Sequence, residues 1–341
     1  MKRRASQAKL KDVAEAAGVS ISTVSRVFSN PERLSPATVQ HVKEVAARLR
    51  FSPNPLARAL ITGTYTNIGL VVPDISNPYM TTLLKAAQAR SRVRGTGVFV
   101  ADTDDSALIE REVCLQLAKQ TRGIILCAPR MSVPHIRELS EMIPIVLVNR
   151  VVDGIPSVYT DSTAAIKALV DELANAGHRR IAYLPGAAQS WANKQRLKAI
   201  ADQTAHRGLE LVKLESTLAR HSDGIAAIPA VVSSGATAVM AFDDVLASGL
   251  IEGLRRAGLS VPADISVTGH DDVLAELVFP GLTTVTGQSA RVGQLAVERL
   301  LEEQSGEGTD ADIKPVGVEG HVVNRDSIGP PPRDIRRAER L

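Results

Sequence analysis

A chain of 341 residues with 44% hydrophobic and 23% charged side chains has the balance of a folded globular protein, which excludes a disordered or fibrous chain. The basic start, MKRRASQAKL, leads into no apolar run, and no stretch approaches the roughly 18 apolar residues that span a membrane. The two cysteines, Cys114 and Cys127, lie apart without a CxxC motif, so we expect buried thiols with neither a disulfide nor a metal site. These features predict a cytoplasmic protein.

The net charge of +3 is distributed unevenly along the chain. Residues 1–60 hold eleven of the 40 basic residues and four of the 37 acidic ones, which leaves +7 on this segment and −4 on the remainder. A compact basic module joined to a mildly acidic body indicates phosphate contacts at one end of the chain. Charge alone is weak evidence, because a basic N-terminal segment is often only a solvated one.

Three short helical patterns occupy residues 9–50. The first, Leu10–Ala17, places apolar residues at positions i, i+3, i+4 and i+7, and Gly18 ends it. A serine caps the second pattern, Ile21–Phe28, and the Ser-Pro pair at 35–36 marks the start of a third helix.

The first two helices have the spacing of a helix-turn-helix. Ala14 is the small residue where the helices meet, Gly18 is the turn glycine, and Val24 is the apolar anchor of the second helix. The second helix then offers small polar and basic side chains to a DNA groove: Ser22, Thr23, Ser25 and Arg26. We expect a DNA-binding domain over residues 1–53, followed by a Pro-interrupted hinge and linker over residues 54–66.

From Asn67 onward, apolar strand patterns alternate with helical ones. The expected strands are Ile68–Val72, Gly97–Ala101, Gly123–Cys127, Ile145–Val148, Ile181–Leu184, Ala238–Phe242 and Ile265–Thr268. The expected helices are Tyr79–Arg92, Ser106–Gln120, Ser162–Ala176, Trp191–His206, Ala219–Ser233 and Val245–Ala257. Wholly apolar strands in this alternation predict parallel sheets covered on both faces. We expect two lobes over residues 67–329 and a disordered tail over residues 330–341.

The exact amino-acid sequence of the N-terminal module is distinctive. It reads LKDVAEAAGVSISTVSRVFSN (Leu10–Asn30) and then SPATVQHVKEVAARLRFSPNPLARAL (Ser35–Leu60), and later stretches read IGLVVPDISNPYM, DELANAGHRRIAYLPG, VPADISVTGHDD and LTTV. In this order they closely resemble the LacI/GalR (lac-repressor) family over nearly the whole chain. The resemblance implies a small all-α helix-turn-helix domain joined to a two-lobed α/β domain of the periplasmic-binding-protein type (type I), with parallel sheets.

By this resemblance, the second helix is the recognition helix of a repressor that binds double-stranded operator DNA. Ile21 and Ser22 would stand at the positions that determine specificity, and Arg26 would read a base edge. Thr23 and Ser25 would contact phosphates or bases. Ile21 replaces the larger or polar residue of some family members, so the operator sequence cannot be copied from a known repressor.

The resemblance also makes Asn54–Leu60 a hinge helix that forms on the operator. Leu60 would wedge into the central base step through the minor groove, while Ala57 and Arg58 pack beside it and Asn54 begins the segment. The alternative is that Leu60 is a linker leucine packed on its own domain.

The family binds its effector between the two lobes, at the ends of strands, where the resemblance implies a polar set of contacts. These candidates are Asn77, Tyr79, Asp102, Asp161, Trp191, Arg196, Asp243 and Asp271. Arg196 would donate hydrogen bonds to ligand oxygens, and Asp271 would accept hydrogen bonds from two ligand hydroxyls. Tyr79 would offer an aromatic face.

Each of these side chains also has a purely structural alternative. Asn77, before a proline, is a good helix start, and Asp161 is a cap, a ligand contact, or both. Trp191 could pack in a core, and Arg196 could be a surface residue of its helix. Asp243 departs from the asparagine usual in the family, which puts an amide contact there in doubt.

The chain lacks the signatures of an enzyme. It has no GxxxxGK[ST], GxSxG or HExxH motif, and Gly95-Thr96-Gly97 precedes a strand instead of opening a helix. We therefore expect no catalytic residue, cofactor or metal, and the N-terminal module argues against a transport binding protein. The prediction is a homodimer on a palindromic operator, controlled by a sugar, cyclitol or nucleoside that the sequence does not identify further.

Overall fold

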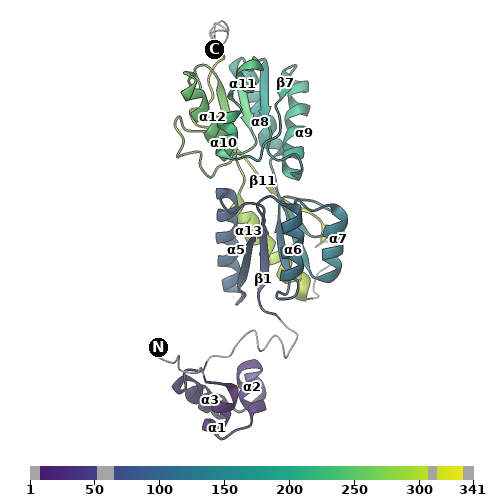
Figure 1. Ribbon diagram of the computed structural model, residues 1–341, viewed down its shortest axis with the longest axis vertical. Coiled ribbons are helices and arrows are strands. Elements are labelled where there is room, and N and C mark those ends of the chain that lie inside the picture. Colours follow the sequence, from purple (N-terminus) through teal and green to yellow (C-terminus); the bar gives the residue numbers. More distant parts are fainter. Residues whose placement is uncertain (1–7, 52–64, 306–312, 333–341) are drawn as a thin grey trace. The chain divides into compact units, whose positions relative to one another are not determined.

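The computed structural model describes residues 8–51, 65–305 and 313–332, and the chain divides after Thr66 into two compact units (Figure 1). The described part of the first unit contains three α-helices and one short 3₁₀ turn. They are α1 (Leu10–Ala17), α2 (Ile21–Ser29), the turn η1 (Pro31–Arg33) and α3 (Pro36–Arg48). The apolar faces of the three helices meet in one core, around Val13, Val24 and Val42.

The turn between α1 and α2 depends on Gly18 and Ser20. Gly18 has a φ of 65°, a left-handed conformation that glycine adopts without a Cβ clash, and this ends α1. The hydroxyl of Ser20 accepts a hydrogen bond from the backbone N–H of Thr23 at 3.1 Å, which caps α2. The two caps fix the angle at which α2 leaves α1.

The second unit begins with a lobe built on a six-stranded parallel sheet in the order β11-β5-β4-β3-β1-β2. Its strands are β1 (Ile68–Val72), β2 (Val98–Asp102), β3 (Ile124–Cys127), β4 (Ile145–Val148), β5 (Ser157–Asp161) and β11 (Val316–Glu319). One face packs on α5 (Pro78–Val93) and α13 (Ser289–Ser305), and the other on α6 (Ala107–Leu117) and α7 (Val133–Met142) (Figure 1). We call this the N-lobe.

The other lobe, the C-lobe, has the sheet order β12-β10-β9-β8-β6-β7, parallel except for β12 against β10. Its strands are β6 (Arg180–Leu184), β7 (Glu210–Lys213), β8 (Ala238–Ala241), β9 (Ser266–Asp271), β10 (Thr283–Thr286) and β12 (Val322–Val323). Its helices are α8 (Thr163–Ala176) and α9 (Trp191–His206) on one face, and α10 (His221–Ala226), α11 (Ile228–Ser233) and α12 (Asp244–Arg256) on the other.

The described chain passes between the lobes after β5, after β10 and after β11. Hydrogen bonds tie these crossings to one another. The N–H of Gly320 donates to the carbonyl of Asp161 at 2.8 Å, and the hydroxyl of Thr160 donates to the carbonyl of Gly287 at 2.6 Å. The crossings therefore form one small hinge at the carboxyl ends of the strands.

The predicted two-lobed architecture with parallel sheets is confirmed, and the predicted strands are present to within a few residues. The prediction of one helix over Ala219–Ser233 is wrong. The structure has two helices there, α10 and α11, because Pro229 lacks the N–H that a continuous helix needs and so begins a new one. None of the described helices is both long and apolar enough to cross a membrane.

The packing of α10 on α12 needs glycines on both helices. A Cβ added to Gly249 would lie 1.9 Å from the carbonyl oxygen of His221, and one added to Gly224 would lie 2.3 Å from the carbonyl oxygen of Leu246. Both contacts are to backbone atoms, which cannot rotate away as a side chain does. This close approach sets the position of the N-terminal end of α10.

Gly249→Ala should lower the free energy of unfolding by about 1–3 kcal/mol or more, because the new methyl group forces α10 away from α12. Urea denaturation followed by circular dichroism measures this loss. The matched control is Ser248→Ala, since the Ser248 hydroxyl donates only to the carbonyl of Val245 in its own helix. Equal stability of the two variants would contradict the close-packing argument.

Candidate functional site

Helix α2 presents one polar face to solvent. Val24 and Val27 are buried in the core of the first unit, whereas Ile21 is 51% exposed at the start of the helix. Of the other predicted DNA contacts, Ser22, Ser25 and Arg26 are exposed and Thr23 is half-buried. The predicted hinge contacts, Asn54, Ala57, Arg58 and Leu60, lie outside the described residues.

A cavity of about 250 Å³ lies between the N-lobe and the C-lobe. It brings together five of the eight predicted effector contacts, which are Asn77, Tyr79, Arg196, Asp243 and Asp271. They come from the loop after β1 and the start of α5, the second turn of α9, the N-cap of α12 and the end of β9. Ligands of open α/β sheets bind beyond the carboxyl ends of strands, which is where this cavity lies.

The guanidinium of Arg196 is held on three sides. One Nη donates to the carboxylate of Asp271 at 3.1 Å, and the other donates to the carbonyl of Phe242. The aromatic ring of Phe242 lies under the guanidinium, 4.5 Å from its central carbon. Arg196 and Asp271 are both buried, so the arginine is a donor held in one position at the wall of the cavity.

Asp271 ends β9 in an unusual backbone conformation. Its φ is 106°, which is costly for any residue other than glycine, by on the order of 1–3 kcal/mol. Its carboxylate accepts from Arg196 and also from Nδ1 of His270, at 2.7 Å. The strained backbone is therefore held by partners of the side chain, and the carboxylate is aimed into the cavity.

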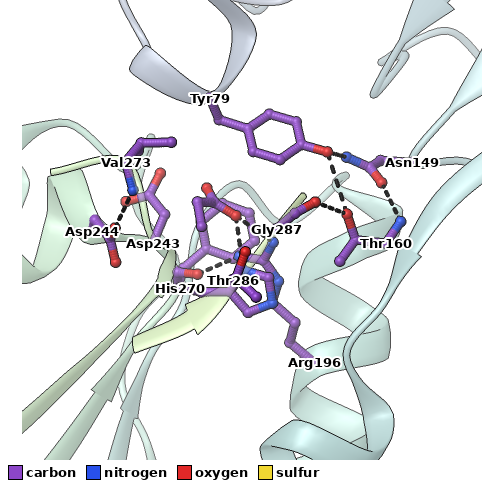
Figure 2. Close-up of polar contacts among 12 residues, drawn as sticks. Tyr79, Asn149, Thr160, Arg196, Asp243, Asp244, His270, Val273, Thr286 and Gly287 are labelled. Atoms are coloured by element: carbon purple, nitrogen blue, oxygen red, sulfur yellow. Dashed lines mark hydrogen bonds and ion pairs between the residues drawn. The ribbon is translucent and has the colours of Figure 1, made fainter. Parts of the chain in front are cut away.

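Tyr79 belongs to a hydrogen-bonded chain that runs along the hinge (Figure 2). The side-chain amide of Asn149 donates to the hydroxyl of Tyr79 at 2.9 Å, and that hydroxyl lies 3.3 Å from the hydroxyl of Thr160. Thr160 donates onward to the carbonyl of Gly287. Burial and the nearby Asp271 carboxylate raise the pKa of Tyr79 to about 12, so its ring stays neutral.

Asp243 joins the two lobes. One of its carboxyl oxygens caps α12 by accepting from the N–H of Leu246 at 2.8 Å, and the other accepts from the side-chain amide of Asn77 at 3.2 Å. Asn77 also caps α5 by accepting from the N–H of Tyr79 at 2.9 Å, as the structural alternative for this residue predicts. A second link between the lobes is the exposed ion pair of Arg220 and Asp104, at 3.6 Å.

The carboxyl groups of Asp243, Asp244 and Asp271 differ in their tendency to ionise. Burial and the charge of Asp271 raise the pKa of Asp243 to about 8 and that of Asp244 to about 7. Burial also disfavours the charge of Asp271, but Arg196 and His270 outweigh it and leave its pKa below the ordinary value. Burial and Arg196 lower the pKa of His270 to about 4, so this histidine is neutral at pH 7.

Asp244 has a structural duty that the sequence did not suggest. It is buried beside the cavity, where it accepts from the N–H of Val273 at 2.9 Å and from the hydroxyl of Thr284 at 2.6 Å. The bond to Val273, which Figure 2 shows, ties the start of α12 to the segment after β9, and the bond to Thr284 ties it to β10. Asp244 thereby fixes the start of α12, where Asp243 lies, relative to the end of β9, where Asp271 lies.

Three predicted contacts lie outside this cavity. Asp102 accepts from the backbone N–H groups of Ile75 and Asp104, at 2.8 and 2.9 Å, and so organises a loop at the edge of the N-lobe. Asp161 accepts from the N–H of Thr163 at the start of α8, as a cap does. Asp161 and Trp191 line a different cavity, described below.

The sequence reasoning missed several side chains that line the cavity. They are Asn149, Arg130, Arg220, His221 and Phe242. Asn149 directly follows the predicted strand Ile145–Val148, so its place after a strand was a signal that could have found it. Arg220 and His221, at the start of α10, carried no such signal, because the sequence predicted them inside one long helix.

Neither a metal nor a reactive thiol is indicated. Among the described residues, no group of three or more His, Cys, Asp or Glu side chains could hold a metal ion. Cys114 and Cys127 are both free and buried, and burial raises the pKa of the Cys114 thiol to about 12. Both cysteines therefore act as small apolar core residues.

Two family models match the chain. The model described as bacterial regulatory proteins, lacI family, matches residues 9–54, and the model of a periplasmic binding protein-like domain matches residues 170–328. The HTH-type transcriptional regulator DegA of Bacillus subtilis (strain 168) is 34% identical over 83% of this chain and 87% of its own length.

Solved structures share the fold over most of the chain. A lac repressor dimer bound to operator and the anti-inducer ONPF has a TM-score of 0.83 and 24% identity, covering 94% of this chain and 99% of its own. A complex of the transcriptional regulator CelR with cellobiose has a TM-score of 0.70 and 25% identity, with the same coverage. The relatives are transcriptional regulators and not enzymes. The chain belongs to the lacI family of bacterial regulatory proteins, as a DNA-binding regulator of transcription.

Proposed function

We propose that this chain is a repressor that binds a palindromic operator as a homodimer and is controlled by a small polyhydroxylated effector. The observation that carries the proposal is the cavity between the lobes, where a fixed arginine and a fixed carboxylate face the same space. Such a pair donates to and accepts from the vicinal hydroxyls of a sugar, cyclitol or nucleoside. The solved CelR–cellobiose complex, which has the same fold, supports a sugar-like ligand.

The DNA-binding half of the proposal rests on α2. Its exposed face carries Ile21, Ser22, Ser25 and Arg26 on a module whose segment holds a net charge of +7. A single arginine on such a helix suits bidentate contact with a guanine edge, and the hydroxyls suit bases or phosphates. The lac repressor dimer on its operator supports this geometry. The predicted wedge at Leu60 stays part of the proposal.

The homodimer is supported by an apolar surface on the C-lobe. In the segment between β9 and β10, Leu277 is 83% exposed and Phe279 is 94% exposed. Side chains of this kind are rarely left adjacent in water without a partner. A two-fold contact through this segment would place two α2 helices on the two halves of a palindrome.

Control by the effector follows from how the lobes are joined. Asn77 reaches Asp243 across the cavity, and Arg220 reaches Asp104 at its edge. A ligand that contacts both lobes favours whichever arrangement closes on it, by its difference in affinity for the two arrangements. The shift then passes through the C-lobe contact of the dimer to the spacing of the DNA-binding domains.

Arg26→Ala should abolish discrimination between operator and unrelated DNA. We expect a loss of roughly tenfold or more in affinity for a duplex selected from a random library, and little change for a scrambled duplex. Fluorescence anisotropy with both labelled duplexes measures this. Arg48→Ala, at the exposed end of α3, is the control and should weaken both duplexes alike. If the wild-type protein binds both duplexes equally, the specific-repressor proposal fails.

Asp271→Asn and Arg196→Lys should each remove the response to the effector. A thermal-shift screen of the wild-type protein with D-ribose, D-glucose, myo-inositol and adenosine identifies the class of ligand. The two variants should lose at least roughly tenfold in affinity for the ligand, because each disrupts the hydrogen-bonded ion pair between the guanidinium and the carboxylate. Lys198→Ala, exposed on the same helix, should bind normally. An unchanged response in both variants would place the effector elsewhere.

Asp243→Asn should flatten the fall in stability between pH 6.5 and 8. The folded pKa of about 8 exceeds the ordinary value of 3.8, so in this window the folded protein holds a proton that the unfolded chain has released. Stability therefore falls as pH rises, by up to ~1.4 kcal/mol per pH unit from this group. Asparagine keeps the cap without ionising. In this window His270 is neutral in the folded protein and partly protonated in the unfolded chain, and its contribution, like that of Asp244, is the same in both proteins.

Thermal unfolding of both proteins at half-unit steps of pH measures the difference. The midpoint of the variant should exceed that of the wild-type protein by more at pH 8 than at pH 6.5. Parallel curves would show that Asp243 is already ionised in the folded protein.

A further inference from the structure

A second cavity, of about 390 Å³, lies at the hinge and is separate from the cavity between the lobes. Its walls come from both lobes, with Val151 and Tyr159 on the N-lobe side and Trp191 on the C-lobe side. Tyr159 and Trp191 pack edge to face across it, with ring centroids 5.4 Å apart and an interplanar angle of 77°. Neither the effector cavity nor the DNA-binding face uses these two rings.

Helix α9 is a wall of both cavities. Ala192 and Arg196, four residues apart, face the effector cavity. Trp191, Gln195 and Ala199, also four residues apart, face the second cavity. Residues four apart share one side of a helix, so the two sets form adjacent stripes on the same rigid element.

Strand β5 is shared in the same way. Thr160 lines the second cavity, and its hydroxyl is bonded to the hydroxyl of Tyr79 and to the carbonyl of Gly287 on the effector side. A molecule in the second cavity would therefore touch both a strand and a helix that position effector contacts.

The chemistry of the walls selects a class of ligand. Trp191 and Tyr159 offer aromatic surface, and hydrogen-bonding groups come from Asp161, Thr163 and Gln195. The described lining residues include one carboxylate and no arginine, lysine or histidine, so an anionic ligand would meet repulsion without a counter-charge. An uncharged ring with several hydroxyls satisfies both the aromatic and the polar walls.

We propose that the hinge cavity is a second small-molecule site, for a neutral pyranose or cyclitol, coupled to the effector cavity through α9. Binding at this site does not depend on the proposed function, whereas the coupling rests on it. Coupling of this kind is reciprocal, so occupancy of either cavity changes the affinity of the other by the same factor.

Trp191 is the single tryptophan of the chain, so its fluorescence reports directly on this site. The full-length protein is titrated with D-glucose, methyl β-D-glucopyranoside and myo-inositol up to roughly 10 mM, the range of weak sites. At least one ring should change the emission saturably. If none of the three does, the proposal is wrong.

Variants then assign the signal to one cavity. Gln195→Ala removes an amide from the wall and should raise the dissociation constant roughly fivefold or more, and Ala199→Leu should fill the space and abolish saturable binding. Lys198→Ala, exposed on the same helix, is the matched control and should bind like the wild-type protein. Circular dichroism checks that each variant folds.

Arg196→Lys separates this inference from the proposed function. The variant should keep the saturable change in Trp191 emission, with a dissociation constant shifted only by the coupling factor, while its response to the effector is lost. If Arg196→Lys abolishes the change and Gln195→Ala does not, the tryptophan reports on the effector cavity and the second site is refuted. If the dissociation constant is the same with and without saturating effector, the coupling is refuted and the site alone stands.

Discussion

The buried ion pair between Arg196 and Asp271 is the interaction on which the effector cavity depends. Removing two charges from water costs several kcal/mol for each ion, and one contact between them does not offset that cost. The guanidinium accordingly uses the carbonyl and the ring of Phe242, and the carboxylate uses His270. Phe242 and His270 stand at the ends of β8 and β9, and Arg196 belongs to α9. The ion pair is therefore stable only when these two strands are adjacent and α9 is packed in its place.

The same pair explains why the lobes are joined by a neutral contact. Burial, together with the charge that Arg196 stabilises on Asp271, raises the pKa of Asp243 to about 8, so Asp243 keeps its proton near pH 7. Its bond to Asn77 is then a bond between uncharged groups, worth on the order of 1 kcal/mol, whereas breaking a buried ion pair costs several times more. The lobes can separate at Asn77 without disturbing Arg196. Under the proposed function, this weak contact beside a rigid polar centre lets a ligand favour one spacing of the lobes over another.

Sequence reasoning predicted the two-lobed fold from local signals, and five of the eight effector candidates that the family resemblance implied line one cavity. Buried parallel strands are continuous apolar runs, and polar residues that follow them meet at one edge of a sheet. Trp191 was grouped with Arg196 because the two are close in sequence, yet each further residue along a helix turns the side that it faces by about 100°. Asp161, at the start of the helix pattern that follows VYTD, lines the same second cavity as Trp191. The structural role of Asp244 could not be predicted from the sequence, because its hydrogen-bond partners Val273 and Thr284 are distant in sequence and belong to no motif.

That rotation by one residue also makes the two cavities dependent on one another. Trp191 and Ala192 are neighbours on α9, yet the first faces the hinge cavity and the second faces the effector cavity. A helix in a packed core moves as a unit, because small shifts of single side chains are resisted by their close-packed neighbours. A ligand that shifts the backbone of α9 at Trp191 therefore turns or slides Arg196 with it. The hydrogen bond between Arg196 and Asp271 tolerates little displacement. Occupancy of the hinge cavity therefore changes the affinity of the effector cavity for the hydroxyls of its ligand.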